Sequence, residues 1–234
     1  MLPVDRFHVS PRSKMGSTGS GKVITKTFEF SDFTGIKVEN GLQVELTKSS
    51  TFSVEVMADD NVIEYIEVNK SGDTLRIKPK ANARFRSATL TAKVTMPDLY
   101  ELELSGGSHA DVTDFSSSHD LSVKLSGGSH VNKSMSPGNI AVGNADFNLS
   151  GGSHVNLSGS ADDLKVKCSG GSHIDLEGFS VNNADINLSG GSHATVNVDG
   201  TLDAKLSGGS RVFYVGEPTM GDVDVDWDSD IIQK

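Results

Sequence analysis

A five-residue motif, Ser-Gly-Gly-Ser-His, constrains the fold of this chain more than any other feature. The motif occupies residues 105–109, 126–130, 150–154, 169–173 and 189–193, and a sixth copy at residues 207–211 ends in arginine instead. Successive copies begin 21, 24, 19, 20 and 18 residues apart. A period of this length is too short for a propeller blade, which takes about 40 residues, and is typical of a solenoid of stacked turns.

Apolar and polar side chains alternate on both sides of the motif. Leu102 and Leu104 precede the first copy, Ala110 and Val112 follow it, and most other copies repeat the pattern. Such alternation predicts two strands that bury one face. The paired glycines suit the corner between them because glycine reaches positive φ freely. We therefore predict an all-β fold in which residues 99–216 form a parallel β-solenoid, with about 4.8 Å between turns.

Stacking makes each column of the aligned repeats a physical column. The outward position before the glycines holds Glu103, Lys124, Asn148, Lys167, Asn187 and Lys205. The position two after the histidine holds Asp111, Asn132, Asn156, Asp175, Thr195 and Phe213. Neither column places like charges on adjacent turns, where they would destabilise the sheet. The histidine column satisfies the same rule only if its imidazoles remain largely neutral.

The segments outside the repeats lack the motif. Residues 1–20, rich in Ser, Gly and Pro, are predicted to form a flexible N-terminal arm. Residues 21–98 alternate like strands and are predicted to form an irregular β-rich part that caps the solenoid. Residues 217–234 contain DVDVDWDSD, which predicts an acidic cap strand because repeated charge blunts an open sheet edge.

Composition excludes several classes of partner. The net charge is −10 and the lysines and arginines are scattered, so we expect no nucleic-acid partner. No apolar stretch approaches 18 residues, so we expect no transmembrane segment. No signal peptide is visible at the start of the chain. The single cysteine, Cys168, excludes an internal disulfide and replaces the leucine of sister repeats, so we expect a small buried hydrophobe.

Four stretches carry a family resemblance over about residues 22–234: FTGIKVENGLQVEL, DDNVIEYIEV, VTMPDLYELELSGGSHADV and YVGEP. Taken in order, they resemble the bacterial family described as putative auto-transporter adhesin, head GIN domain. The resemblance implies a right-handed parallel β-helix, located in the cell envelope or outside the cell, often in Bacteroidetes. It transfers no catalytic residue, because the family has no agreed set. Relatives often read SGAG where this chain has SGGSH.

The preferred interpretation of the histidines is a ladder of stacked neutral rings, as is common for like residues in stacked β structure. On this basis we predict a non-catalytic protein without a cofactor, which contacts surface glycans or other envelope proteins. The predicted ligand face consists of His109, Asp111, His130, Asn132, His154, Asn156, His173, Asp175, His193 and Arg211.

A metal-binding ladder is the first alternative. Imidazoles of His130, His154 and His173 on adjacent turns offer ligands for zinc, copper or nickel. Against this, a flat ladder presents its ligands in a line, whereas zinc prefers a tetrahedron.

A polysaccharide-active, pectinase-like enzyme is the second alternative. Asp111 and Asp175 lie three turns apart, so about 14 Å separates them, beyond the roughly 5–9.5 Å of glycosidase carboxylate pairs. Ser108 and His109 cannot form a hydrolase dyad, because neighbours on a strand face opposite sides. The sequence therefore favours binding over catalysis.

Overall fold

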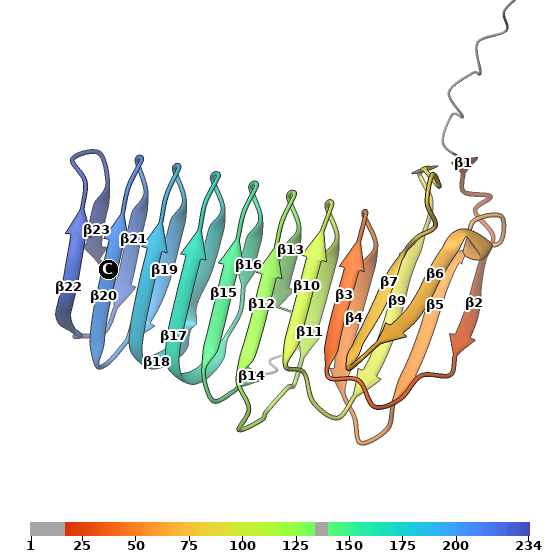
Figure 1. The fold of residues 1–234 in the computed structure, drawn as a ribbon, viewed down its shortest axis with the longest axis horizontal. Coiled ribbons are helices and arrows are strands. Elements are labelled where there is room, and N and C mark those ends of the chain that lie inside the picture. Colours follow the sequence, from red (N-terminus) through yellow and green to blue (C-terminus); the bar gives the residue numbers. More distant parts are fainter. Residues whose placement is uncertain (1–16, 134–139) are drawn as a thin grey trace, which may run out of the picture.

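In the computed structural model, which describes residues 17–133 and 140–234, the chain coils into a row of stacked turns (Figure 1). The predicted all-β solenoid is confirmed: among the described residues the only helix is a single 3-10 turn, Ile63–Tyr65. Each turn contributes one strand to each of two long parallel sheets, which meet at the corners that the repeat motif forms. Most of the predicted N-terminal arm, residues 1–16, lies outside the described residues.

The first sheet begins at the N-terminal end of the coil and ends at the C-terminal end. In order, it contains β7 (Thr74–Pro79), β3 (Gly35–Glu39), β10 (Glu101–Ser105), β12 (Leu121–Leu125), β15 (Ala145–Leu149), β17 (Gly159–Cys168), the end of β18 (His173–Leu188), β20 (Thr201–Leu206) and β22 (Thr219–Val225). All of these neighbours pair in parallel.

The second sheet follows the same order on the other side of the corners. It contains β9 (Leu90–Met96), β4 (Gln43–Lys48), β11 (His109–Thr113), β13 (His130–Lys133), β16 (His154–Asn156), the start of β18, β19 (His193–Val198), β21 (Arg211–Val215) and β23 (Asp230–Gln233). On a short third side of the coil, β14 (Ile140–Ala141) pairs with the start of β17, and the start of β17 pairs with the middle of β18.

Antiparallel strands cover the N-terminal end of the coil. β5 (Ser53–Asp59) pairs with β9 and with β2 (Val23–Phe28), and β6 (Ile66–Ser71) pairs with β7. Two-residue strands β1 (Ser17–Thr18) and β8 (Phe85–Arg86) pair beside them. The carboxylate of Asp59 is buried and accepts hydrogen bonds from the backbone N–H of Gly21 at 2.6 Å and of Thr89 at 2.8 Å.

The solenoid register continues beyond the repeat motif at both ends. β3 and β4 lie directly beside β10 and β11, although no SGGS joins them. Asn40 and Gly41 form their corner with φ values of 62° and 81°, close to the 66° and 78° of Gly106 and Gly107. At the other end, β22 and β23 within residues 217–234 make a further complete turn.

Each motif corner closes on an internal hydrogen bond. The second serine of every motif is fully buried, and its hydroxyl donates to the backbone carbonyl of the first serine, three residues earlier. The six distances lie between 2.7 and 2.8 Å, for Ser108, Ser129, Ser153, Ser172, Ser192 and Ser210. An inward polar group is thereby satisfied within its own corner, as buried hydroxyls require.

Apolar columns fill the interior between the sheets. One of them stacks the last inward residue before each corner, and every member is at most 3% exposed: Leu104, Leu125, Leu149, Cys168, Leu188 and Leu206. Burial raises the pKa of the Cys168 thiol to about 12. Cys168 is therefore an inert core residue, as the sequence predicts.

Substitution of the two glycines of one corner tests how closely adjacent corners pack. Alanine is strained at both Gly127 and Gly128, where φ is 65° and 75°, at a cost of about 1–2 kcal/mol. At Gly127 the new Cβ would also lie 3.2 Å from the backbone nitrogen of Gly106, whereas at Gly128 it meets nothing within 4 Å. In urea unfolding, Gly127→Ala should therefore lower the free energy of unfolding more than Gly128→Ala. Equal losses would contradict close packing of the corners.

Candidate functional site

Five histidines form one column on the outer face of the second sheet. His109, His130, His154, His173 and His193 lie directly opposite one another on consecutive parallel strands. The histidines align because each one comes directly after the buried serine of its corner. Neighbouring residues on a strand face opposite sides, so each histidine faces outward. We call these five residues the histidine column.

The imidazole rings of the column stack face to face. Adjacent ring centroids lie 5.8, 6.0, 5.7 and 4.8 Å apart from the first pair to the last, with interplanar angles of 22°, 20°, 15° and 9°. Three of these distances exceed the strand spacing of about 4.8 Å, so those rings are offset from one another. The last pair, His173 and His193, is the most nearly parallel.

The column continues past the histidines in both directions. Arg211 follows His193 on β21, and its Nε lies 3.1 Å from Oδ2 of Asp230 on the last turn. Gln43 precedes His109 on β4. Sequence comparison of the repeats identified Arg211 but missed Gln43, because the corner before Gln43 is built from Asn-Gly. The Asn-Gly pair, which favours positive φ, was the available signal.

A second polar column lies two residues further along the same strands. Asp111 accepts a hydrogen bond at 3.2 Å from Nε2 of Gln43, and its Oδ1 lies 4.0 Å from Nε2 of His109. Asn156 lies opposite Asp175. The backbone of Asn132 lies beside Asp111, and the side chain of Asn132 is outside the described residues.

The two columns together make one polar surface on the second sheet, which we call the histidine face. It contains the side chains of His109, Asp111, His130, His154, Asn156, His173, Asp175, His193 and Arg211, and Asn132 belongs to it by backbone register alone.

Burial and neighbouring groups favour the neutral form of two histidines in the column, His154 and His193. Partial burial, followed by the neighbouring His173 and His130, lowers the pKa of His154 below the ordinary 6.5. Partial burial, His173 and Arg211 likewise lower the pKa of His193. His173 places Nδ1 3.1 Å from the carbonyl oxygen of Gly171, so Nδ1–H donates there in the neutral ring and Nε2 is left as an acceptor.

The stacked geometry does not suit a metal ion. Near-parallel rings hold their nitrogen lone pairs in parallel planes, so the lone pairs of His130, His154 and His173 do not converge on one point. Across the described ranges, 17–133 and 140–234, no group of three or more His, Cys, Asp or Glu residues is arranged to hold one.

The candidate catalytic pairs are also kept apart. Asp111 and Asp175 lie three strands apart in register, about 14 Å at the usual strand spacing. The hydroxyl of Ser108 points inward and donates to the carbonyl of Ser105, whereas His109 faces outward. The histidine face therefore presents a repetitive set of hydrogen-bond donors and acceptors on the outer side of the second sheet.

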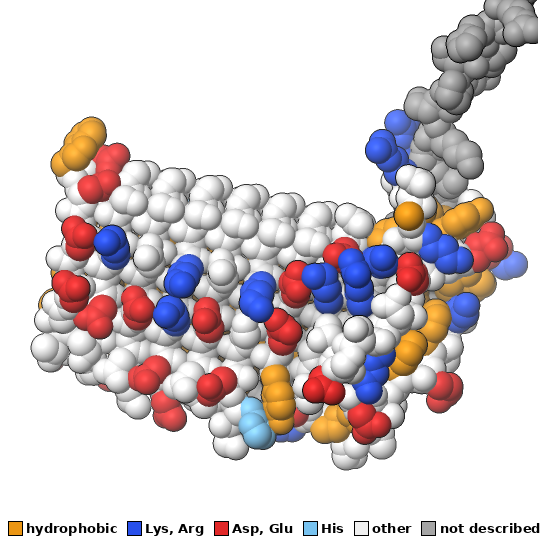
Figure 2. Space-filling view, in the orientation of Figure 1, with side chains coloured by type: hydrophobic (Ala, Val, Ile, Leu, Met, Phe, Trp, Pro, Cys, Tyr) orange, Lys and Arg blue, Asp and Glu red, His pale blue; other side chains and the backbone are white. Residues whose placement is uncertain are grey.

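Charged side chains dominate the outer face of the first sheet instead. Figure 2 shows them in rows that cross the strands, beside an uncharged ridge formed by the corners. The register places Lys124, Lys167 and Lys205 on alternate turns with asparagines between them. No helix in the part of the chain that the structure describes is long and apolar enough to cross a bilayer.

Comparison with known proteins identifies a family and a shared fold. The model of the family described as "Putative auto-transporter adhesin, head GIN domain" matches residues 32–218. A crystal structure described as a putative adhesin from Bacteroides fragilis superposes with a TM-score of 0.84 at 19% identity, covering 94% of this chain and 100% of that one. No curated protein matches the chain.

Two Parabacteroides structures share the fold at similar identity. A putative adhesin from Parabacteroides merdae has a TM-score of 0.74 at 19% identity, covering 94% of this chain and 99% of that one. A protein from Parabacteroides distasonis described as a putative lipid binding protein has a TM-score of 0.71 at 18% identity, covering 94% and 100%.

The lowered pKa values of His154 and His193 predict how stability depends on pH. Both histidines take up protons more readily when unfolded, so their contribution is complete above about pH 6.5 and is lost as the pH falls below it. Urea unfolding should therefore give a lower free energy of unfolding at pH 5.0 than at pH 7.5, and His154→Gln should reduce the difference. The pKa values of Asp60 and Asp226 are lowered from the ordinary 3.8, so these carboxylates take up protons only below the range from pH 5.0 to pH 7.5. Equal stability at both pH values would contradict a column held neutral.

Proposed function

The chain belongs to the putative auto-transporter adhesin, head GIN domain family, and from this premise we propose that it is a non-catalytic interaction protein of the cell envelope or the extracellular space. Its function is to present a repetitive polar surface to a binding partner. The partner we propose is a surface glycan or another envelope protein, bound without a cofactor.

The observation that carries this proposal is the unbroken histidine face. A neutral imidazole has one hydrogen-bond donor and one acceptor, so each turn that carries a histidine presents the same donor and acceptor. The strand ladder fixes the spacing of these groups before any partner arrives, which reduces the entropy lost on binding. A repetitive partner can therefore make the same contact on several turns.

The geometry of the histidine face supports binding over catalysis. General acid–base chemistry needs groups that converge on one substrate atom, and here the rings of His109, His130 and His154 are stacked one above another along the column. The interior of the coil is filled by apolar side chains such as Phe147 and Phe179. We therefore place the contact surface on the outside of the coil.

Replacement of His130, His154 and His173 together by asparagine tests the proposal. Asparagine keeps a donor and an acceptor but is too short to reach the same partner atoms, so the triple variant should stay folded and bind at least about tenfold more weakly. Binding is measured on a glycan array and on intact cells, and folding by thermal unfolding.

The matched control replaces Lys124, Lys167 and Lys205, on the outer face of the other sheet, by glutamine. This variant should keep the binding of the parent protein. Binding that survives the histidine substitutions, or that is lost only in the lysine variant, would contradict a contact surface on the histidine face.

A further inference from the structure

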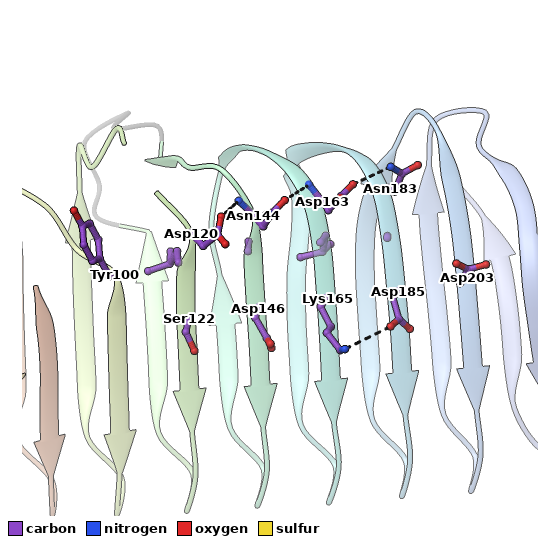
Figure 3. Close-up of a pocket in the computed structure, with 14 residues that line it drawn as sticks. Tyr100, Asp120, Ser122, Asn144, Asp146, Asp163, Lys165, Asn183, Asp185 and Asp203 are labelled. Atoms are coloured by element: carbon purple, nitrogen blue, oxygen red, sulfur yellow. Dashed lines mark hydrogen bonds and ion pairs between the residues drawn. The ribbon is translucent and has the colours of Figure 1, made fainter. Parts of the chain in front are cut away.

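A groove of about 610 Å³ crosses the strands on the outer face of the first sheet, opposite the histidine face (Figure 3). It extends from Tyr100 across β12, β15, β17, β18 and β20 as far as Asp203. Its floor is apolar, formed on successive strands by Leu121, Ala145, Leu164 and Ala184. Two rows of polar side chains form its walls.

Hydrogen bonds between adjacent turns hold the first wall rigid. Oδ1 of Asp120 accepts from the backbone N–H of Asn144 at 2.8 Å, and Oδ1 of Asn144 accepts from that of Asp163 at 3.2 Å. Asn183 donates from Nδ2 to Oδ1 of Asp163 at 2.8 Å, and its own Oδ1 accepts from the backbone N–H of Thr201 at 3.1 Å. The row is therefore set in place before a ligand binds, with carboxylate oxygens that can accept further hydrogen bonds.

The second wall contains two carboxylates that are opposed on adjacent strands. Asp146, Lys165, Asp185 and Asp203 lie opposite one another on consecutive strands. Lys165 Nζ lies 3.9 Å from Oδ2 of Asp185 on one side. On the other side Asp185 faces Asp203, and directly opposed like charges destabilise a sheet. A bound cationic group would relieve this repulsion.

An aromatic ring closes one end of the groove. Tyr100 is half-buried, and its ring packs against the ring of His119 with the centroids 4.6 Å apart and the planes at 44°. The contact with His119 fixes the orientation of the tyrosine ring, which lines the groove. An aromatic face of this kind attracts cations and the apolar faces of ligands.

We propose that this groove binds a linear, amine-bearing glycan, of which an oligomer of glucosamine is the simplest example. The five carboxylates against one lysine favour ammonium groups and repel uronates, sulfated glycans and nucleic acids. Five strand steps separate the turn of Tyr100 from that of Asp203, so the groove is roughly 24 Å long. It takes a short stretch of a longer chain.

The spacing of the walls favours a glycan over a peptide. Polar groups recur along each wall at the strand spacing of about 4.8 Å, close to the length of one pyranose unit in an extended chain. In an extended basic peptide, side chains on one face recur at about 6.8 Å, which falls out of step with the walls within two turns. A sugar unit can instead lie beside a polar side chain of each wall on every turn.

The test titrates the whole protein with glucosamine hexamer in low salt near pH 6, where the amines are protonated, and follows backbone amide resonances and heats of binding. The hexamer should shift resonances around Tyr100, Asp146 and Asp185. Tyr100→Ala, and Asp146→Asn with Asp185→Asn, should each weaken binding about 5- to 30-fold. Asp185→Asn removes both the repulsion from Asp203 and the exposed ion pair with Lys165, and exposed ion pairs contribute little to stability, so this variant should remain folded.

Two control variants test whether hexamer binding depends on this groove in particular. Glu64→Gln makes the same carboxylate-to-amide change at an exposed residue of the 3-10 turn and should bind like the parent. The variant lacking His130, His154 and His173 should also keep hexamer binding, so a failure of the histidine face and a failure of the groove are distinguishable.

Three results would overturn the proposal. The first is no saturable binding of the hexamer at millimolar concentration. The second is groove variants that bind it as the parent does. The third is a lysine hexapeptide that binds as tightly with the same dependence on Tyr100, which would assign the groove to basic peptides.

Discussion

The hydrogen bond between the two serines of each corner is the interaction on which the rest of the architecture depends. It joins a buried hydroxyl to a carbonyl three residues earlier, across two glycines at positive φ, as in Ser153 and Ser150. The corner it closes fixes where the second strand begins and which side chain faces in. The residue after the buried serine must then face solvent on every turn, and the histidine column follows directly.

A column of this length is compatible with a sheet only when adjacent rings are not charged together. Five protonated imidazoles on adjacent strands would oppose like charges at every step, the arrangement that destabilises a sheet. Burial and neighbouring rings lower the pKa of His154 and His193 and thus favour the neutral form. On the outer face of the first sheet, one column separates its lysines by asparagines, so these positive charges are not opposed on adjacent strands. Like charges remain opposed at Asp185 and Asp203, which line the proposed groove.

The regular part of this fold could be predicted from the sequence because each repeat carries its own corner. Strand, corner, strand, and the alternation of Lys124, Asn148 and Lys167 all follow from aligning one motif with itself. The turn that presents Gln43 could not be found in this way, since Asn40 and Gly41 replace the glycine pair. The antiparallel pairing of β5 with β9 could not be predicted from the sequence either, because it depends on the chain turning back over its own first turn. The groove was hidden for a different reason: its walls lie before the conserved part of each repeat, where the spacing between successive motifs varies from 18 to 24 residues. Only the paired register shows that Asp120, Asn144 and Asp163 form one row.

An NMR titration of the histidine column with zinc, on chelator-treated protein without an affinity tag, decides whether the column is a neutral stacked surface or a metal-binding strip. Stacked rings whose nitrogens do not converge have no common point at which to hold the ion. The imidazole resonances of His130, His154 and His173 should therefore stay unchanged at low micromolar zinc. Broadening or shifting of all three together in that range would contradict a neutral stacked surface and make the column a metal-binding strip.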